Sequence, residues 1–173
     1  MNSLDSRRTA LVLIDLMPRI IALDTAPFTG QEVLDRSVAL AKATRSAGGL
    51  VVNVRVERPG LDVQPEGSEF APAVAPQPGD LEIVKNTIGA FGRTTLDAEL
   101  QSRGITHLAL AGIATNFGVE STARAASDLG YELIFITDAM TGLDEPSHTF
   151  ALTQIFPRLG TLTTTTNYTT SLT

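Results

Sequence analysis

Short apolar runs alternate with longer amphipathic segments along most of the chain. Runs such as 10–14 and 50–56 are almost continuously aliphatic, which is typical of strands covered on both faces. The segment 31–47 instead repeats its apolar residues every three or four positions, as a helix does. The pattern predicts strands over residues 10–14, 50–56, 81–84, 105–111, 132–137 and 160–164, and helices over residues 31–47, 95–103, 119–129 and 146–156.

Strands that alternate with helices at this spacing predict an α/β fold. We expect three layers, doubly wound (Rossmann-like), around a mainly parallel six-stranded sheet, in a single domain over residues 1–173. Residues 57–80 hold five of the nine prolines and are interpreted as a long loop over the sheet. The polar, threonine-rich end, about 165–173, is expected to be loose.

Composition narrows the function classes. With 43% hydrophobic and 18% charged residues, the chain is typical of a soluble globular protein. A net charge of -6 disfavours nucleic acid, no apolar segment is long enough for a membrane span, and the N-terminus does not resemble a signal peptide. We therefore expect a cytoplasmic protein with a small-molecule partner. The absence of cysteine excludes disulfides and a thiolate nucleophile.

Polar residues follow three of the predicted strands. Asp15 and Lys85 each end a strand, and the loop 115–118 follows the strand 105–111. In parallel sheets, sites lie beyond the carboxyl ends of the strands, so these residues are expected to converge. Asp15 is either a cap or a partly desolvated general acid or base. Lys85 is either a solvated strand end or a group that holds Asp15 or an anionic substrate.

Residues 111–126 read A-G-I-A-T-N-F-G-V-E-S-T-A-R-A-A, a strand that runs into a helix. Thr115 and Asn116 are expected to cap that helix, and its first N–H groups would face an anion or oxyanion. An ordinary strand-to-helix joint is the alternative. Arg55 is a candidate contact for a substrate carboxylate, and Phe91 a candidate apolar wall or core residue.

Metal and nucleotide chemistry find little support in the sequence. Neither His107 nor His148 has a second ligand at a spacing typical of metal sites, so no metal site is predicted. The phosphate-binding loop G-x-x-x-x-G-K and the dinucleotide motif G-x-G-x-x-G are absent, and so is the esterase motif G-x-S-x-G. No cofactor is predicted.

Several of these motifs occur together in one known family. The order is Asp15 after an apolar strand, I-V-K ending at Lys85, G-A-F, T-x-L-D-A-E-L, G-I-A-T-N-F-G-V-E-S-T-A-R-A-A, and D-A-M-T. From about residue 9 to residue 164 the chain resembles the isochorismatase-like (cysteine-hydrolase) superfamily. That resemblance implies the fold predicted above and a triad whose Asp and Lys are Asp15 and Lys85.

The third member of that triad is a cysteine in most of the family, and the matching residue here is Gly118. Cysteine-dependent amide hydrolysis is therefore excluded. In this glycine the chain resembles true isochorismatases, which hydrolyse a vinyl ether and release pyruvate. It also resembles a separate glycine-for-cysteine subgroup with the same F-G-V-E-S-T-A-R motif, whose substrate is generally unassigned. The resemblance implies Asp15, Lys85 and Gly118 at the catalytic centre. The predicted substrate-binding residues are Ala114, Thr115, Asn116, Phe117, Val119, Phe91 and Arg55.

Two functions remain open at this stage. The first is cofactor-independent hydrolysis of a small anionic substrate, with Asp15 as the acid of a vinyl-ether cleavage. The second is a catalytically degenerate member of the same fold that binds a metabolite or partner. The resemblance also implies a homo-oligomer, either a dimer or a tetramer.

Overall fold

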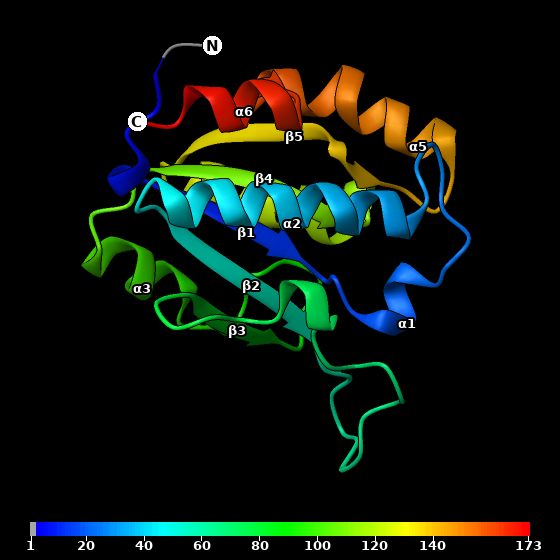
Figure 1. The fold of residues 1–173 in the computed structure, drawn as a ribbon. Helices are drawn as coiled ribbons and strands as arrows, with labels where there is room; N and C mark the ends of the chain where they lie inside the picture. The colour runs from blue at the N-terminus through cyan, green and yellow to red at the C-terminus, as the bar shows by residue number, and fades with distance from the viewer. Residues whose placement is uncertain (1–2) are drawn as a thin grey trace.

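The structure, a computed structural model, describes residues 3–173. Six strands form one sheet in the order β3-β2-β1-β4-β5-β6, and every neighbouring pair is parallel (Figure 1). The strands are β1 (Thr9–Ile14), β2 (Leu50–Val56), β3 (Leu81–Lys85), β4 (His107–Ile113), β5 (Glu132–Thr141) and β6 (Gly160–Thr163). The predicted six-stranded parallel sheet is confirmed. Its strand order reverses between β1 and β4, where α/β sheets bind ligands.

Helices cover both faces of this sheet. They are α1 (Pro18–Ile21), α2 (Gly30–Ser46), α3 (Leu96–Ser102), α4 (Glu120–Asp128), α5 (Glu145–Phe150) and α6 (Thr165–Ser171). Successive side chains of the central strand β1 point to opposite faces. Ala10, Val12 and Ile14 pack in the layer that contains residues of α3 and α4, and Leu11 and Leu13 in the layer of α2 and α6. The continuous apolar run of β1 therefore reflects burial on both faces.

The predicted helix 146–156 is interrupted in the structure. Asp144 caps α5 by accepting a hydrogen bond of 2.7 Å from the Ser147 N–H, and α5 ends at Phe150. A π-helical turn (Ala151–Ile155) and a 3-10 turn (Phe156–Arg158) follow. Pro157 has no N–H to donate to the preceding turn, so the chain cannot continue as a regular α-helix there.

The expectation of a loose C-terminal end is wrong, because residues Thr165–Ser171 form helix α6. The side chain of Thr164 accepts a hydrogen bond of 3.3 Å from the Asn167 N–H at the start of this helix. Tyr168 of α6 is fully buried and packs in the layer of α2 and α6. Its hydroxyl lies 3.2 Å from that of Thr44 in α2. One buried aromatic residue and a helix cap thus order a segment whose composition suggested a solvated tail.

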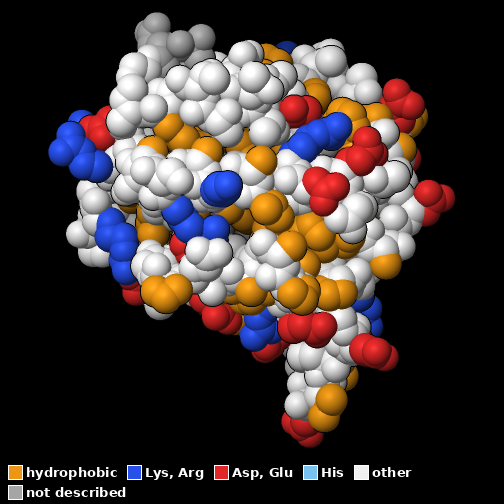
Figure 2. All heavy atoms as spheres, in the orientation of Figure 1, with side chains coloured by type: hydrophobic (Ala, Val, Ile, Leu, Met, Phe, Trp, Pro, Cys, Tyr) orange, Lys and Arg blue, Asp and Glu red, His pale blue; other side chains and the backbone are white. Residues whose placement is uncertain are grey.

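Residues 57–80 form the expected long loop, with one short 3-10 turn (Pro72–Val74). Its first part projects from the body of the molecule (Figure 1) and carries acidic and apolar side chains (Figure 2). The Gln64 side chain bridges the base of this projection: it accepts from the Arg58 N–H at 2.8 Å and donates to the Arg58 carbonyl at 3.1 Å. Within residues 3–173, no helix is both long and apolar enough to cross a membrane.

Candidate active site

Three parallel strands of the sheet deliver the central residues of the site. β1 ends at Ile14 and is followed by Asp15, β3 ends at Lys85, and β4 ends at Ile113 before the π-helical turn η3 (Thr115–Val119). Asp15 has a φ of 55°, in the left-handed region that few residues other than glycine adopt. Its N–H donates to the Val54 carbonyl of β2 at 2.9 Å, which holds this turn at the sheet edge.

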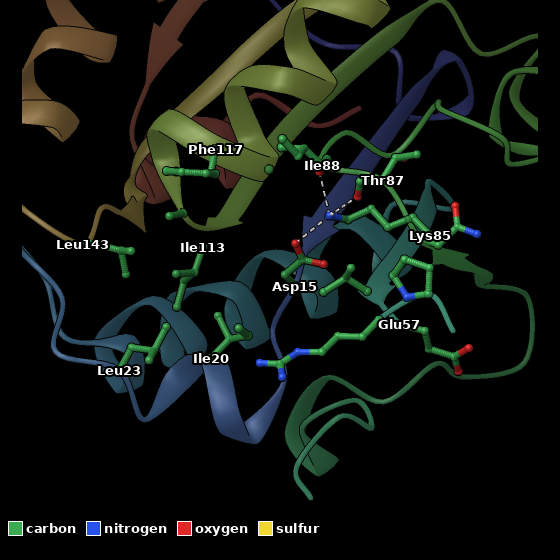
Figure 3. Close-up of a pocket in the computed structure, with 16 residues that line it drawn as sticks. Asp15, Ile20, Leu23, Glu57, Lys85, Thr87, Ile88, Ile113, Phe117 and Leu143 are labelled. Carbon is green, nitrogen blue, oxygen red and sulfur yellow. Dashed lines mark hydrogen bonds and ion pairs between the residues drawn. The ribbon is translucent and has the colours of Figure 1, made fainter. Parts of the chain in front are cut away.

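Asp15 and Lys85 form a buried ion pair. The Lys85 Nζ lies 2.8 Å from Asp15 Oδ2, and the two residues are only 2% and 7% exposed, respectively. The same ammonium donates to the Ile88 carbonyl at 2.7 Å and to the Thr87 carbonyl at 3.3 Å (Figure 3). An ammonium group has three donors, so all of them have partners within the protein. Lys85 therefore fixes Asp15 rather than presenting a free charge.

Two opposing effects act on the proton affinity of the Asp15 carboxyl. Burial raises the pKa of Asp15 above its usual range, and the adjacent Lys85 ammonium offsets this effect only in part. Lys85 contacts only Oδ2. Among residues 3–173, Oδ1 is buried and has no hydrogen-bond partner. A proton on Oδ1 would leave the contact between Oδ2 and Lys85 in place.

Gly118 lies close against this carboxyl. A Cβ atom at position 118 would lie 3.1 Å from Asp15 Oδ2, 3.1 Å from the Ile14 side chain and 3.6 Å from the Ile88 carbonyl oxygen. Any larger residue would thus project against the Asp15 carboxyl. Because position 118 has no side chain, nothing projects from it against the carboxyl, which forms part of the wall of the pocket described next.

A pocket of about 390 Å³ opens onto this pair. Its volume is within the range of small-molecule sites. The lining residues are Asp15, Ile20, Leu23, Val56, Glu57, Arg58, Pro59, Lys85, Asn86, Thr87, Ile88, Ile113, Ala114, Phe117, Gly118 and Leu143. Asp15, Lys85, Gly118, Ala114 and Phe117 were predicted from the sequence, and the structure brings these five together around one cavity.

Other predicted site residues lie elsewhere. Thr115 is fully buried, and its hydroxyl lies 2.8 Å from Nδ1 of His148; it caps no helix. Asn116 also provides no cap and lines two smaller hollows outside the main pocket. The expected N–H groups at this turn are partly used, because those of Phe117 and Val119 both donate to the Ala114 carbonyl. The chain enters α4 through a π-helical turn, so a conventional capped start does not form.

The remaining three predicted pocket residues are turned away from the cavity. Val119 lies in the apolar core, and Phe91 packs against that core with its ring 5.9 Å from the ring of Tyr131. Arg55 pairs with Glu57 at 2.6 Å and lies 3.8 Å from Glu82. The position of Phe91 matches the core alternative, whereas Arg55 is held by acidic side chains of the protein. The three residues do not line the pocket.

Several residues that line the pocket were not predicted from the sequence. Glu57 and Arg58 directly follow β2, and the strand-end rule that identified Asp15 and Lys85 applies to them equally. Ile20, Leu23 and Leu143 come from α1 and from loops, where apolar residues give no periodic signal. Within residues 3–173, no group of three or more His, Cys, Asp or Glu side chains is placed to hold a metal ion.

The parallel sheet and the pocket at its switch point define an α/β protein with a small-molecule site at the carboxyl edge of the sheet. Residues 9–167 match the isochorismatase domain, and the chain belongs to the isochorismatase family. It is 40% identical over 184 residues to the uncharacterized isochorismatase family protein YwoC of Bacillus subtilis, and the match covers 95% of each chain.

Two further relatives support the same assignment. The chain is 35% identical over 178 residues to the uncharacterized isochorismatase family protein YecD of Escherichia coli O157:H7, a match that covers 92% of this chain and 93% of the relative. Among solved structures, an isochorismatase family protein from Burkholderia thailandensis superposes with a TM-score of 0.90 at 38% identity, over 99% of both chains. The fold is therefore that of an isochorismatase-family hydrolase.

Proposed function

We propose that this protein is a cofactor-independent hydrolase that cleaves a small anionic vinyl ether, with Asp15 as the proton donor. The observation that carries the proposal is the buried Asp15 carboxyl in the wall of the pocket, with no side chain at position 118 to cover it. Substrate can reach the acid directly there. Vinyl-ether hydrolysis needs a proton donor and water but no protein nucleophile.

The lining of the pocket disfavours acyl transfer. The chain has no cysteine, and the only lining residue with a hydroxyl is Thr87, which donates to the carbonyls of Gly89 and Gly92. No histidine lines the pocket to serve as its base. A nucleophile of this kind needs an adjacent base within hydrogen-bond reach.

In the proposed reaction, Asp15 delivers its proton to the terminal methylene carbon of the vinyl ether. The double-bond electron pair forms the new C–H bond, and the ether oxygen stabilises the resulting oxocarbenium ion. Water adds to the cationic carbon and returns a proton to the Asp15 carboxylate. The hemiketal then collapses to an alcohol and a 2-oxo acid. The raised pKa of Asp15 favours the protonated starting state.

Lys85 and Arg58 have different roles in this scheme. All three donors of Lys85 are engaged, so it orients Asp15 and stabilises the carboxylate that forms after proton transfer. Arg58 lines the pocket and makes no ion pair with any of residues 3–173, so its guanidinium is available to a substrate carboxylate. A carboxylate held in the pocket would also raise the pKa of Asp15 further.

The test is incubation of the purified protein with isochorismate and other vinyl-ether carboxylates, with pyruvate release as the readout. The Asp15→Asn variant keeps the size of the side chain but has no proton to give. We expect turnover to fall by about 100-fold or more, the typical contribution of a general acid. Unchanged turnover in Asp15→Asn would refute the mechanism. Ligand binding without turnover would identify a binding protein instead.

A further inference from the structure

The pocket is divided into an apolar side and a charged side. Ile20, Leu23, Ile113, Phe117 and Leu143 lie together on one side, and Asp15, Lys85, Thr87 and Glu57 lie on the other (Figure 3). The apolar side comes from α1, the end of β4, the turn η3 and the loop after β5. A ligand that fills the pocket must therefore be amphipathic.

The apolar side is unusually open to solvent in the free protein. Leu23, Phe117 and Leu143 are each between 44% and 54% exposed, although they line a concave surface. Covering such side chains contributes about 25 cal/mol for every Å² of apolar surface removed from water. A hydrocarbon group on the ligand would gain this contribution, whereas a charged group would lose its hydration without a partner.

The apolar side of the pocket is an unfavourable place for an anionic group. None of the five side chains there is charged. The lining cations are Arg58 and Lys85, and Lys85 lies on the charged side with all three of its donors engaged (Figure 3). A carboxylate that rests on these five side chains would lose its hydration against apolar surface, which costs free energy.

We propose that the natural substrate is a monocarboxylate vinyl ether whose alcohol portion is an uncharged hydrocarbon body resting on Ile20, Leu23, Ile113, Phe117 and Leu143. This inference rests on the proposed function, because the proton donor Asp15 fixes where the reactive carbon lies. With that carbon against Asp15, the carboxylate lies on the charged side and the alcohol portion extends over the apolar side. Isochorismate carries a second carboxylate on its ring, so it fits this pocket poorly.

Binding of inert ethers of lactate tests the inference without any turnover. The probes are the cyclohexyl ether, the carboxycyclohexyl ether and the methyl ether of lactate, which have no double bond to protonate. We expect calorimetry to show the cyclohexyl ether binding at least about tenfold tighter than either of the other two. The carboxycyclohexyl ether tests the charge, and the methyl ether tests the hydrocarbon body.

Leu143→Ala removes part of the apolar side, and Leu129→Ala is its matched control. Leu129 is a similarly exposed leucine at the end of α4, outside the pocket. We expect Leu143→Ala to weaken the cyclohexyl ether by about three- to tenfold and to leave the methyl ether unchanged. We expect Leu129→Ala to change neither.

Three results would overturn the inference: equal or tighter binding of the carboxycyclohexyl ether, an unchanged affinity in Leu143→Ala, or no binding of any probe. Failure of the proposed function gives a different result. In that case the order of affinities holds, while the corresponding vinyl ether is bound and not cleaved.

Discussion

Removal of the Lys85 charge tests how strongly the buried Asp15–Lys85 pair is coupled. Lys85→Met keeps most of the length of the side chain but leaves Asp15, which is only 7% exposed, without its counter-ion. Loss of one partner of a buried ion pair costs about 3–5 kcal/mol. Asp15 can take up a proton instead, so we expect a loss near the lower end, about 3 kcal/mol near neutral pH. That is a large fraction of the roughly 5–15 kcal/mol that stabilises a typical domain.

The pH dependence of this loss has a definite sign. Burial already raises the pKa of folded Asp15, and removal of Lys85 takes away the opposing effect and raises it further. A carboxyl with a raised folded pKa contributes stability that is complete below its unfolded pKa of about 3.9 and is lost as the pH rises through the folded value. The loss caused by Lys85→Met is therefore small near pH 4 and grows toward neutral pH.

Urea unfolding of the wild type, Lys85→Met and the double variant Asp15→Asn/Lys85→Met at about pH 4.5 and about pH 7.5 measures this coupling. The double variant has no buried charge at either position. We expect it to recover at least about 2 kcal/mol of the neutral-pH loss and to lack the added pH dependence. An equal loss for Lys85→Met at both pH values would refute the reasoning, and so would a double variant no more stable than Lys85→Met.

Two further variants test other parts of the structure. Gly118→Ala places a Cβ 3.1 Å from Asp15 Oδ2, and we expect the free energy of unfolding to change by less than about 1 kcal/mol while ligand affinity falls. The control Ser127→Ala, in α4 but outside the pocket, should leave ligand affinity unchanged. Equal affinities in the two variants would contradict this account. Tyr168→Ala removes the buried anchor of α6 and should cost about 3–5 kcal/mol in thermal or urea unfolding, whereas a loss below about 1 kcal/mol would show that α6 is held by other contacts.

The fold could be predicted from the sequence because its strongest signals are local. The run Ala10–Ile14 is apolar at every position, and the structure buries it from both faces. The strand-end rule then located Asp15 and Lys85, since the carboxyl ends of parallel strands share one edge. Their convergence depended only on topology, which the alternation of elements already defined.

The side-chain partners could not be predicted in the same way. Arg55 is diverted from the pocket by Glu57 and Glu82, and Thr115 faces His148, which is 33 positions along the chain. Such choices depend on which groups the tertiary fold places within hydrogen-bond distance. Helix α6 was not predicted for a related reason. The burial of Tyr168 depends on Thr44 and α2, which are far away in the sequence.

The bridge between Gln64 and Arg58 separates two parts of the projecting loop. Arg58 stays at the pocket on one side of the bridge, while Arg19 donates to the Gly67 carbonyl and to the Ser68 hydroxyl beyond it. The tip around Gly60–Val63 lies between these two fixed points. Residues can therefore be added or removed at the tip without displacing the arginine that lines the pocket. Length variation there and ligand selectivity in the pocket are free to evolve independently, and the tip is a natural position for an inserted label.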